Sequence, residues 1–348
     1  MKILHFPQSL PMITSCHALK KIDVDATSVQ FASHSFGFQP DNCLNLQKVS
    51  NSMVKVKIRE FLKDAGQQYD LFHFHDMPKG HFTPDAKDIA ILKKSSKPII
   101  IQHHGSEVRR LSIARSFNNP YVKVKGYWRN EKKIISRLRQ WGELIDYAII
   151  ADHELLPYIK DYYKSIHIIR QPIDVSQYSP SYPNSKNDRP IIVHAPSHTD
   201  IKGTIYINEA VTRLKNEGFS FDFHVIQKTN HETARQKYQQ ADIIVDQLLI
   251  GAYGTLSLEG MALGKPVICY IREDLLVTYP KNLPIISANP DTIYEQLKIL
   301  IVDSVKRNEI GKKSRDYVEK YHDSILIAEQ LKAIYEKVLK ENQSNGQD

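Results

Sequence analysis

Short apolar runs alternate along the chain with longer polar stretches whose composition suits helices. In the first half these runs occupy residues 2–6, 28–33, 69–74, 97–103, 147–151 and 167–171. Alternation of this kind predicts parallel strands joined by crossover helices. The expected fold class is therefore α/β.

The alternation stops at residues 173–189 and then starts again. This stretch is rich in proline and serine and has no regular period, which is typical of an interdomain connection. Apolar runs return at 190–195, 221–227, 242–247, 266–271 and 284–288, and residues 202–218 have the spacing of an amphipathic helix. We expect two Rossmann-like, doubly wound domains, 1–172 and 190–323, facing a central cleft. Residues 324–348 are expected to form a helix that packs back towards the first domain, followed by a frayed tail.

Composition narrows the class of protein. A chain of 348 residues, 41% hydrophobic and 25% charged, is typical of a soluble globular protein. No apolar run approaches the roughly 18–20 residues of a membrane span, and the N-terminal run is too short for a signal peptide. The three cysteines are far apart and form no CxxC pair. This spacing argues against a disulfide framework or a zinc ribbon and predicts a cytoplasmic protein.

Basic residues are concentrated in one segment. Residues 1–170 carry 26 Lys and Arg against 16 Asp and Glu, and residues 109–139 alone hold ten basic residues and one acidic residue. Apolar residues at helical spacing over 121–141 resemble an interfacial helix that contacts a membrane or an anionic acceptor. A packed helix with a solvated basic face fits equally well. The candidate patch consists of Lys123, Lys125, Arg129, Lys132 and Lys133. No nucleic-acid-binding motif is present, so no nucleic acid is expected.

A glycine-containing loop follows the apolar run 242–247. Gly251 and Gly254 precede an expected helix that starts near Thr255, and Glu259 lies one turn further on. A helix N-terminus behind glycine presents unpaired N–H groups and suits phosphate, while a carboxylate there can accept hydrogen bonds from ribose hydroxyls. A simple packing turn with a solvated glutamate would give the same pattern.

Lys202 follows the run 190–195 at the start of the expected helix. An ammonium group there is suited to a diphosphate, although a surface lysine would have the same spacing. Ser197 lies in the loop between this strand and Lys202.

Histidines end two apolar runs of the first half. His103 and His104 follow the run 97–103, and a histidine there can donate to a substrate hydroxyl or transfer a proton. His73 and His75 share one face of a strand with metal-ligand spacing, but no complete ligand set accompanies them, so no metal is expected.

The segments HHGSEVR, RQPIDVSQYSP, HAPSHTDIKGT and YQQADIIVDQLLIGAYGTLSLEGMALGKPVICYIRED together resemble glycosyltransferase family 4, of GT-B fold. The resemblance implies transfer of a hexose-type sugar, with retention, from a nucleotide diphosphate, commonly UDP, without a metal cofactor. It implies that Lys202 contacts the diphosphate, that Glu259 binds the ribose, and that His104 is the catalytic group near the sugar. The implied donor set also includes Gly251, Gly254, Thr255, Leu256 and Ser197. The acceptor candidates are His75, Asp76 and Glu107.

Three departures from the family pattern leave alternatives open. Gly251 replaces the first of two glutamates, and the stretch containing Thr199 lacks a common arginine. The loop 7–13 also lacks a glycine pair. An inactive glycosyltransferase-like partner subunit and a sugar-nucleotide 2-epimerase of the same fold are the alternatives. A nicotinamide-dependent dehydrogenase is disfavoured because no GxGxxG follows a strand. The expected acceptor is a sugar, a lipid-linked sugar or another anionic molecule, in cell-surface polysaccharide or glycolipid synthesis at the inner face of the membrane.

Overall fold

The structure is a computed structural model that describes residues 1–7, 9–33, 37, 39–77, 80–124 and 130–344. The chain forms two compact units. The first comprises Met1–Arg110, Asn130–Pro172 and Ser324–Asp348, and the second comprises Leu111–Arg129 and Ile173–Asp323. The expected first domain, 1–172, differs from the first unit in two segments, because residues 111–124 belong to the second unit and the C-terminal segment from Ser324 belongs to the first.

The first unit is built on a parallel sheet. Its strands are β1 (Lys2–Phe6), β2 (Asp25–Gln30), β3 (Asn42–Cys43), β4 (Leu71–His75), β5 (Ile99–His103), β6 (Tyr147–Ile150) and β7 (Ser165–Ile168). Its helices are α1 (Leu10–Lys21), the 3₁₀ turn η1 (Leu46–Lys48), α2 (Asn51–Gln68), α3 (Ala86–Lys93), α5 (Glu131–Gly142), α6 (Leu156–Ile159) and α14 (Ser324–Ser344). The 7-stranded order β3-β2-β1-β4-β5-β6-β7 reverses direction between β1 and β4, as in a Rossmann fold.

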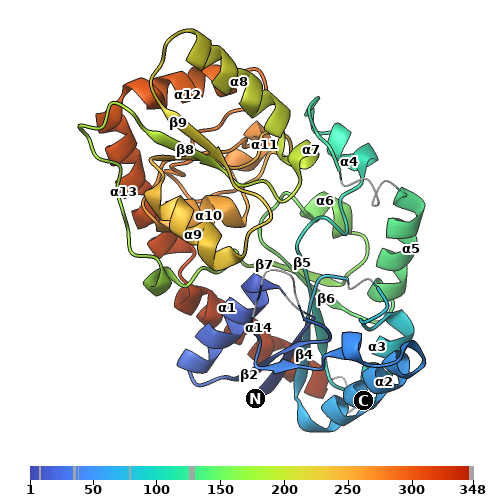
Figure 1. Ribbon diagram of the computed structural model, residues 1–348. Coiled ribbons are helices and arrows are strands. Elements are labelled where there is room, and N and C mark those ends of the chain that lie inside the picture. Colours follow the sequence, from blue (N-terminus) through green and yellow to red (C-terminus); the bar gives the residue numbers. More distant parts are fainter. Residues whose placement is uncertain (8, 34–36, 38, 78–79, 125–129, 345–348) are drawn as a thin grey trace. The chain divides into compact units, whose positions relative to one another are not determined.

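The C-terminal helix α14 packs against the first sheet, as expected. Ile327, Leu331 and Tyr335 recur at four-residue spacing and are buried with Ile3, Leu71 and residues of α1. Helices α1 and α14 lie side by side (Figure 1). The apolar stripe of the last helix therefore completes the core of the first unit.

The second unit repeats the architecture on a 4-stranded parallel sheet. Its strands are β8 (Ile191–His194), β9 (Asp222–Val225), β10 (Ile243–Val245) and β11 (Val267–Ile268). Its helices are α4 (Leu111–Arg115), the 3₁₀ turn η3 (Val175–Gln177), α7 (Thr199–Lys202), α8 (Thr204–Asn216), α9 (His231–Gln240), α10 (Thr255–Ala262), α11 (Glu273–Leu276), α12 (Ile293–Val302) and α13 (Ser304–Tyr321). The α/β class and two sheets of Rossmann type are confirmed.

Three details differ from the expected elements. The helix expected over 202–218 is divided by Gly203, whose φ of 77° is left-handed, into α7 and α8. The run 284–288 forms only an isolated bridge between Ile286 and Ile268. Strand β2 starts at Asp25, earlier than the run 28–33.

The expected interfacial helix over 121–141 is wrong. Helix α5 begins at Glu131, because the Asn130 side chain caps it by accepting from the N–H of Lys133. Ile134, Leu138 and Trp141 are buried, so the apolar stripe packs inward. Tyr121 and Val124 lie before this helix and in the second unit. The packed helix with a solvated basic face is the observed arrangement of α5.

Candidate functional sites

The topology of the second sheet identifies one strand edge as a candidate site. The order β11-β10-β8-β9 reverses direction between β8 and β10. In doubly wound folds, ligands bind beyond the carboxyl ends of the strands at such a reversal. Strand β10 ends at Val245 and is followed directly by Asp246, while β8 ends at His194.

A buried ion pair lies at this edge. Asp246 is fully buried and accepts a hydrogen bond at Oδ1 from Nζ of Lys202 at 2.7 Å. Its Oδ2 accepts from Oγ of Ser257 at 2.7 Å, and Lys202 also donates to Oε1 of Gln247 at 2.9 Å. Burial alone would raise the pKa of Asp246, but the Lys202 ammonium and these hydrogen bonds lower it. Lys202 is therefore held at the strand end and is not a loose surface lysine.

The N-terminus of α10 is open beside this pair. Gly254 is its N-cap residue and supplies no side-chain cap. The first N–H groups of a helix have no partner within it. A Cβ placed on Gly254 would meet only Oδ2 of Asp246, at 3.8 Å. The backbone of Gly254, Thr255 and Leu256 can therefore be approached closely, as an anion site requires.

Gly251 lies in the same loop as Gly254, between β10 and α10. Its φ is 90°, and a Cβ there would overlap Cγ of Arg272 and lie 2.9 Å from its Cδ. The N–H of Arg272 donates to the Gly251 carbonyl at 2.9 Å. The Arg272 guanidinium pairs with both carboxylate oxygens of Asp274 and lies 4.2 Å above the ring of Phe117. Backbone conformation and packing both require glycine at this position.

Glu259 lies in the second turn of α10 and is held by two neighbours. Its Oε1 accepts from the Tyr178 hydroxyl at 2.9 Å and is hydrogen-bonded to Nε2 of His231. That bond raises the pKa of His231. Glu259 is only 4% exposed, so its carboxylate is fixed in place. Sequence reasoning missed Tyr178 and His231, which come from distant segments and carry no motif.

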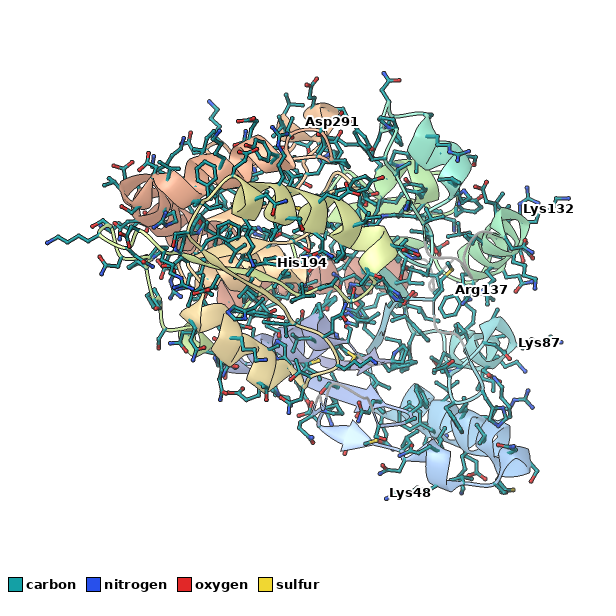
Figure 2. All side chains as sticks on the ribbon, turned by 45° about the horizontal axis from the view of Figure 1, so that its top comes forward. Lys48, Lys87, Lys132, Arg137, His194 and Asp291 are labelled. Carbon is teal, nitrogen blue, oxygen red and sulfur yellow. The ribbon has the colours of Figure 1, made fainter. Side chains whose placement is uncertain are left out.

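The β8 end of the site contains a neutral histidine. His194 is buried, and burial lowers its pKa to about 4. Its Nδ1 lies 2.8 Å from the Val245 carbonyl and its Nε2 lies 2.9 Å from Oγ1 of Thr204. The carbonyl must accept, so Nδ1 carries the proton. His194 thus joins β8, β10 and α8 inside the second unit (Figure 2). Ser197 is exposed in the loop that follows, and Thr199 is exposed at the start of α7.

The acceptor candidates lie at the carboxyl ends of β4 and β5 in the first unit. The N–H of His104 donates to Oε1 of Glu107 at 2.9 Å, while Nε2 of His104 is buried and has no hydrogen-bond partner among the residues that the structure describes. Burial lowers the pKa of His104. Glu107 is fully buried, and its Oε1 lies 3.1 Å from Nδ1 of His103. The other ring nitrogen of His103, Nε2, lies 2.9 Å from the hydroxyl of Tyr163. Glu107 therefore shapes the loop that carries His104.

Asp76 follows β4 in a left-handed conformation with φ 87°. Burial and the neighbouring Glu107 raise its pKa, whereas the contacts of Glu107 with His103 lower the pKa of Glu107 despite its burial. Among the described residues, Oδ1 of Asp76 and Oε2 of Glu107 are buried and have no other hydrogen-bond partner. A protonated Asp76 can donate a hydrogen bond to Glu107 and so satisfy both oxygens. Asp76 and Glu107 thus behave as one carboxyl pair.

His75 belongs to a buried histidine cluster with His5 and His73. Nδ1 of His5 lies 3.0 Å from Nε2 of His75, and Nδ1 of His73 lies 2.7 Å from the hydroxyl of Tyr335. Burial lowers the pKa of all three histidines. Their candidate ligand atoms lie within 4.8 Å of one another. Two nitrogens bound to one tetrahedral zinc ion would be about 3.4 Å apart.

The candidate basic patch is divided between the two units. Lys132 and Lys133 are exposed on α5 of the first unit, where Figure 2 shows Lys132 at the surface. Lys123 is exposed but belongs to the second unit. Lys125 and Arg129 lie outside the described residues. Within the described ranges, no helix combines the length and hydropathy that a membrane span requires.

Comparison with known proteins supports the fold. No protein-family model matches the chain, and no curated protein matches it in sequence. Anabaena HepE, solved with UDP and glucose, has 15% identity and a TM-score of 0.64, covering 96% of this chain and 99% of that one. Sucrose-phosphate synthase of Thermosynechococcus elongatus has 14% identity and a TM-score of 0.62, covering 98% and 100%.

A third similar structure is a variant of S. aureus TarM in complex with fondaparinux, alpha-GlcNAc-glycerol and UDP. It has 12% identity and a TM-score of 0.59, covering 96% of this chain and 99% of that one. At such identities these matches establish the fold alone. The chain has the GT-B fold.

Proposed function

We propose that this protein is a glycosyltransferase that binds a nucleotide-diphosphate sugar, with UDP as the carrier, at the carboxyl edge of the second sheet. The sugar passes to an acceptor hydroxyl with retention of configuration. HepE and the TarM variant, which have the same fold, were solved with UDP, and this supports a nucleotide-sugar donor. The proposal requires no bound metal or cofactor.

One observation carries the proposal. The N-terminus of α10 lies behind Gly254, which supplies no side-chain cap and whose Cβ position is open. Ser257 of this helix and the Lys202 ammonium both donate to the carboxylate of Asp246. Backbone N–H groups, a helix dipole and a lysine are the groups that bind a diphosphate. Glu259 lies on the same helix, and we assign the ribose hydroxyls to its carboxylate.

The chemical work that we propose is positioning and charge stabilisation. As the bond from the sugar to the diphosphate breaks, negative charge grows on the leaving group, and the α10 N–H groups and Lys202 stabilise it. We propose that the acceptor hydroxyl attacks the sugar from the face that the diphosphate leaves. The new bond to the acceptor oxygen then replaces the broken one with retention, and the diphosphate accepts the hydroxyl proton. His104, neutral and with no partner for Nε2 among the described residues, is proposed to donate a hydrogen bond to the transferred sugar.

We propose an acceptor that is a sugar, lipid-linked or otherwise anionic, in polysaccharide or glycolipid synthesis. The exposed Lys132 and Lys133 on α5 support an anionic partner, which includes the surface of a membrane. His75, Asp76 and Glu107 remain the acceptor candidates, of which Glu107 has a structural role in the His104 loop.

A thermal-shift screen against nucleoside diphosphates and their sugar conjugates tests the proposal. A ligand at 100 times its dissociation constant stabilises the protein by about 2.7 kcal/mol, which moves the melting temperature measurably. We expect a shift with UDP or a UDP-sugar, followed by slow hydrolysis or transfer detectable as released UDP. Absence of a shift with every nucleotide would favour the inactive-partner alternative, and conversion of the sugar without an acceptor would favour the epimerase.

A further inference from the structure

Asp246 is an acidic group at a place where an anionic ligand is proposed to bind. It has 0% exposure, and both of its carboxylate oxygens accept hydrogen bonds from groups suited to a phosphate. These groups are the ammonium of Lys202 and the hydroxyl of Ser257, the third residue of α10. The Cβ position of Gly254, at the open helix end, lies 3.8 Å from Oδ2.

The contacts of Asp246 resemble those that a phosphate oxygen would make. A lysine, a hydroxyl near a helix N-terminus and the helix dipole all favour a negative charge. The pair of Lys202 and Asp246 has no net charge, so Lys202 in this arrangement adds little long-range attraction for a diphosphate. Glu259 and Asp274 are likewise matched by His231 and Arg272.

We propose that Asp246 is an internal counter-ion that competes with the diphosphate of the donor for Lys202, and that it thereby sets the affinity for the nucleotide. This inference rests on the proposed function. The Lys202 ammonium donates two of its three protons to Asp246 and Gln247, so a second hydrogen bond to a bound diphosphate must displace one of these acceptors. When the nucleotide product leaves, Asp246 again satisfies Lys202, so the empty site contains no unpaired buried cation. Asp246 thus lowers the affinity for the product and favours its release.

The opposite role for Asp246 would be to present Lys202 to the ligand. The two roles predict opposite effects of Asp246→Asn. The amide keeps an oxygen that can accept from Lys202 but removes the negative charge. A competitor predicts tighter binding of a diphosphate, whereas a presenting residue predicts weaker binding.

Calorimetric titration of UDP and uridine into four proteins distinguishes these roles. The proteins are the wild type, Asp246→Asn, Lys202→Met and the double variant. We expect Asp246→Asn to bind UDP about tenfold more tightly, a change of about 1.4 kcal/mol, with uridine unchanged. Uridine has no phosphate, so a general disturbance of the site would alter both ligands.

The double variant keeps the test valid if Asp246→Asn alone does not fold. Replacing both members of a buried pair is tolerated better than removing one. We expect Lys202→Met to bind UDP more weakly than the wild type. In that variant the Asp246 carboxylate has lost its cation and repels the diphosphate directly, so we expect the double variant to bind UDP more tightly than Lys202→Met. Equal or weaker UDP binding by Asp246→Asn than by the wild type, or weaker binding by the double variant than by Lys202→Met, would overturn the inference. Failure of the wild type to bind UDP, any other nucleoside diphosphate or inorganic pyrophosphate would instead overturn the proposed function.

Discussion

Arg272 occupies the space into which a side chain at position 251 would extend. A Cβ on Gly251 would overlap Cγ of Arg272, and the φ of Gly251 is 90°. The resemblance to glycosyltransferase family 4 implies a glutamate at this position. A glutamate there would require Arg272 to leave its contacts with Asp274 and Phe117. The departure at Gly251 is therefore built into the packing of the loop.

Gly251→Ala should destabilise the protein by about 2–5 kcal/mol, since left-handed strain costs about 1–2 kcal/mol and overpacking about 1–3 kcal/mol. Gly218→Ala is the matched control, because Gly218 has a φ of 87° and no atom within 4 Å of its Cβ position. Gly218→Ala should lose only the stability that corresponds to left-handed strain. Urea denaturation measures the free energy of unfolding of both variants. Equal losses would show that Arg272 can move aside without destabilising the protein.

Gly254→Ala should cost only about 0.5–1 kcal/mol of stability, because alanine is a poorer N-cap than glycine but the φ of Gly254 is −129° and its Cβ position is open. The added methyl group would instead occupy the approach to the first N–H groups of α10. We expect UDP affinity to fall at least about tenfold by calorimetry, or about 1.4 kcal/mol. Unchanged affinity would mean that the diphosphate does not approach the helix past Gly254.

The pair of His231 and Glu259 predicts a pH dependence of stability. The hydrogen bond with Glu259 raises the folded-state pKa of His231 above its unfolded value of about 6.5. The stabilisation is therefore fully present below about pH 6.5 and is lost as the pH rises through the folded pKa. His231→Gln should lower the melting temperature more at pH 6 than at pH 9. His224→Gln, at an exposed histidine, is the control, and identical pH profiles for wild type and His231→Gln would refute the coupling.

The basic face of α5 predicts binding to anionic surfaces. Lys132→Glu combined with Lys133→Glu should reduce sedimentation with vesicles that contain acidic lipid, because each basic residue near such a surface contributes about 1 kcal/mol. Lys312 and Lys313 on α13 are an exposed pair in the second unit, and their reversal to glutamate is the control. Equal sedimentation of the Lys132/Lys133 variant and the wild type would remove the membrane from the proposed function.

The sequence predicts the elements better than the contacts between them. Strand β4 and strand β10 are recognisable because buried parallel strands are continuous apolar runs. The sequence alone could not assign residues 111–124 to the second unit, because their hydrogen bonds join segments far apart in the chain. The Asn119 side chain, for example, donates to the Leu249 carbonyl. The helix expected over 121–141 failed because apolar spacing continued across the position where Asn130 caps α5.

The residues of the candidate site also fall into those that the sequence predicts and those that it does not. Gly254, Lys202 and Glu259 follow from local patterns, since a glycine loop, a strand end and a helix start are adjacent in sequence. Asp246 was missed because one acidic residue after an apolar run resembles an ordinary strand end. Its importance comes from the approach of Lys202 and Ser257, which only the fold brings together.

Calorimetric titration of UDP into the wild type and Glu259→Ala tests the central claim most directly. The exposed Glu209 on α8 provides a control as Glu209→Ala. We expect saturable binding to the wild type and the control, and binding weaker by about 1.5–3 kcal/mol in Glu259→Ala, the size of lost hydrogen bonds to a charged group. The same dissociation constant in all three proteins would contradict a donor site on α10, and no binding to the wild type would contradict the proposed UDP donor.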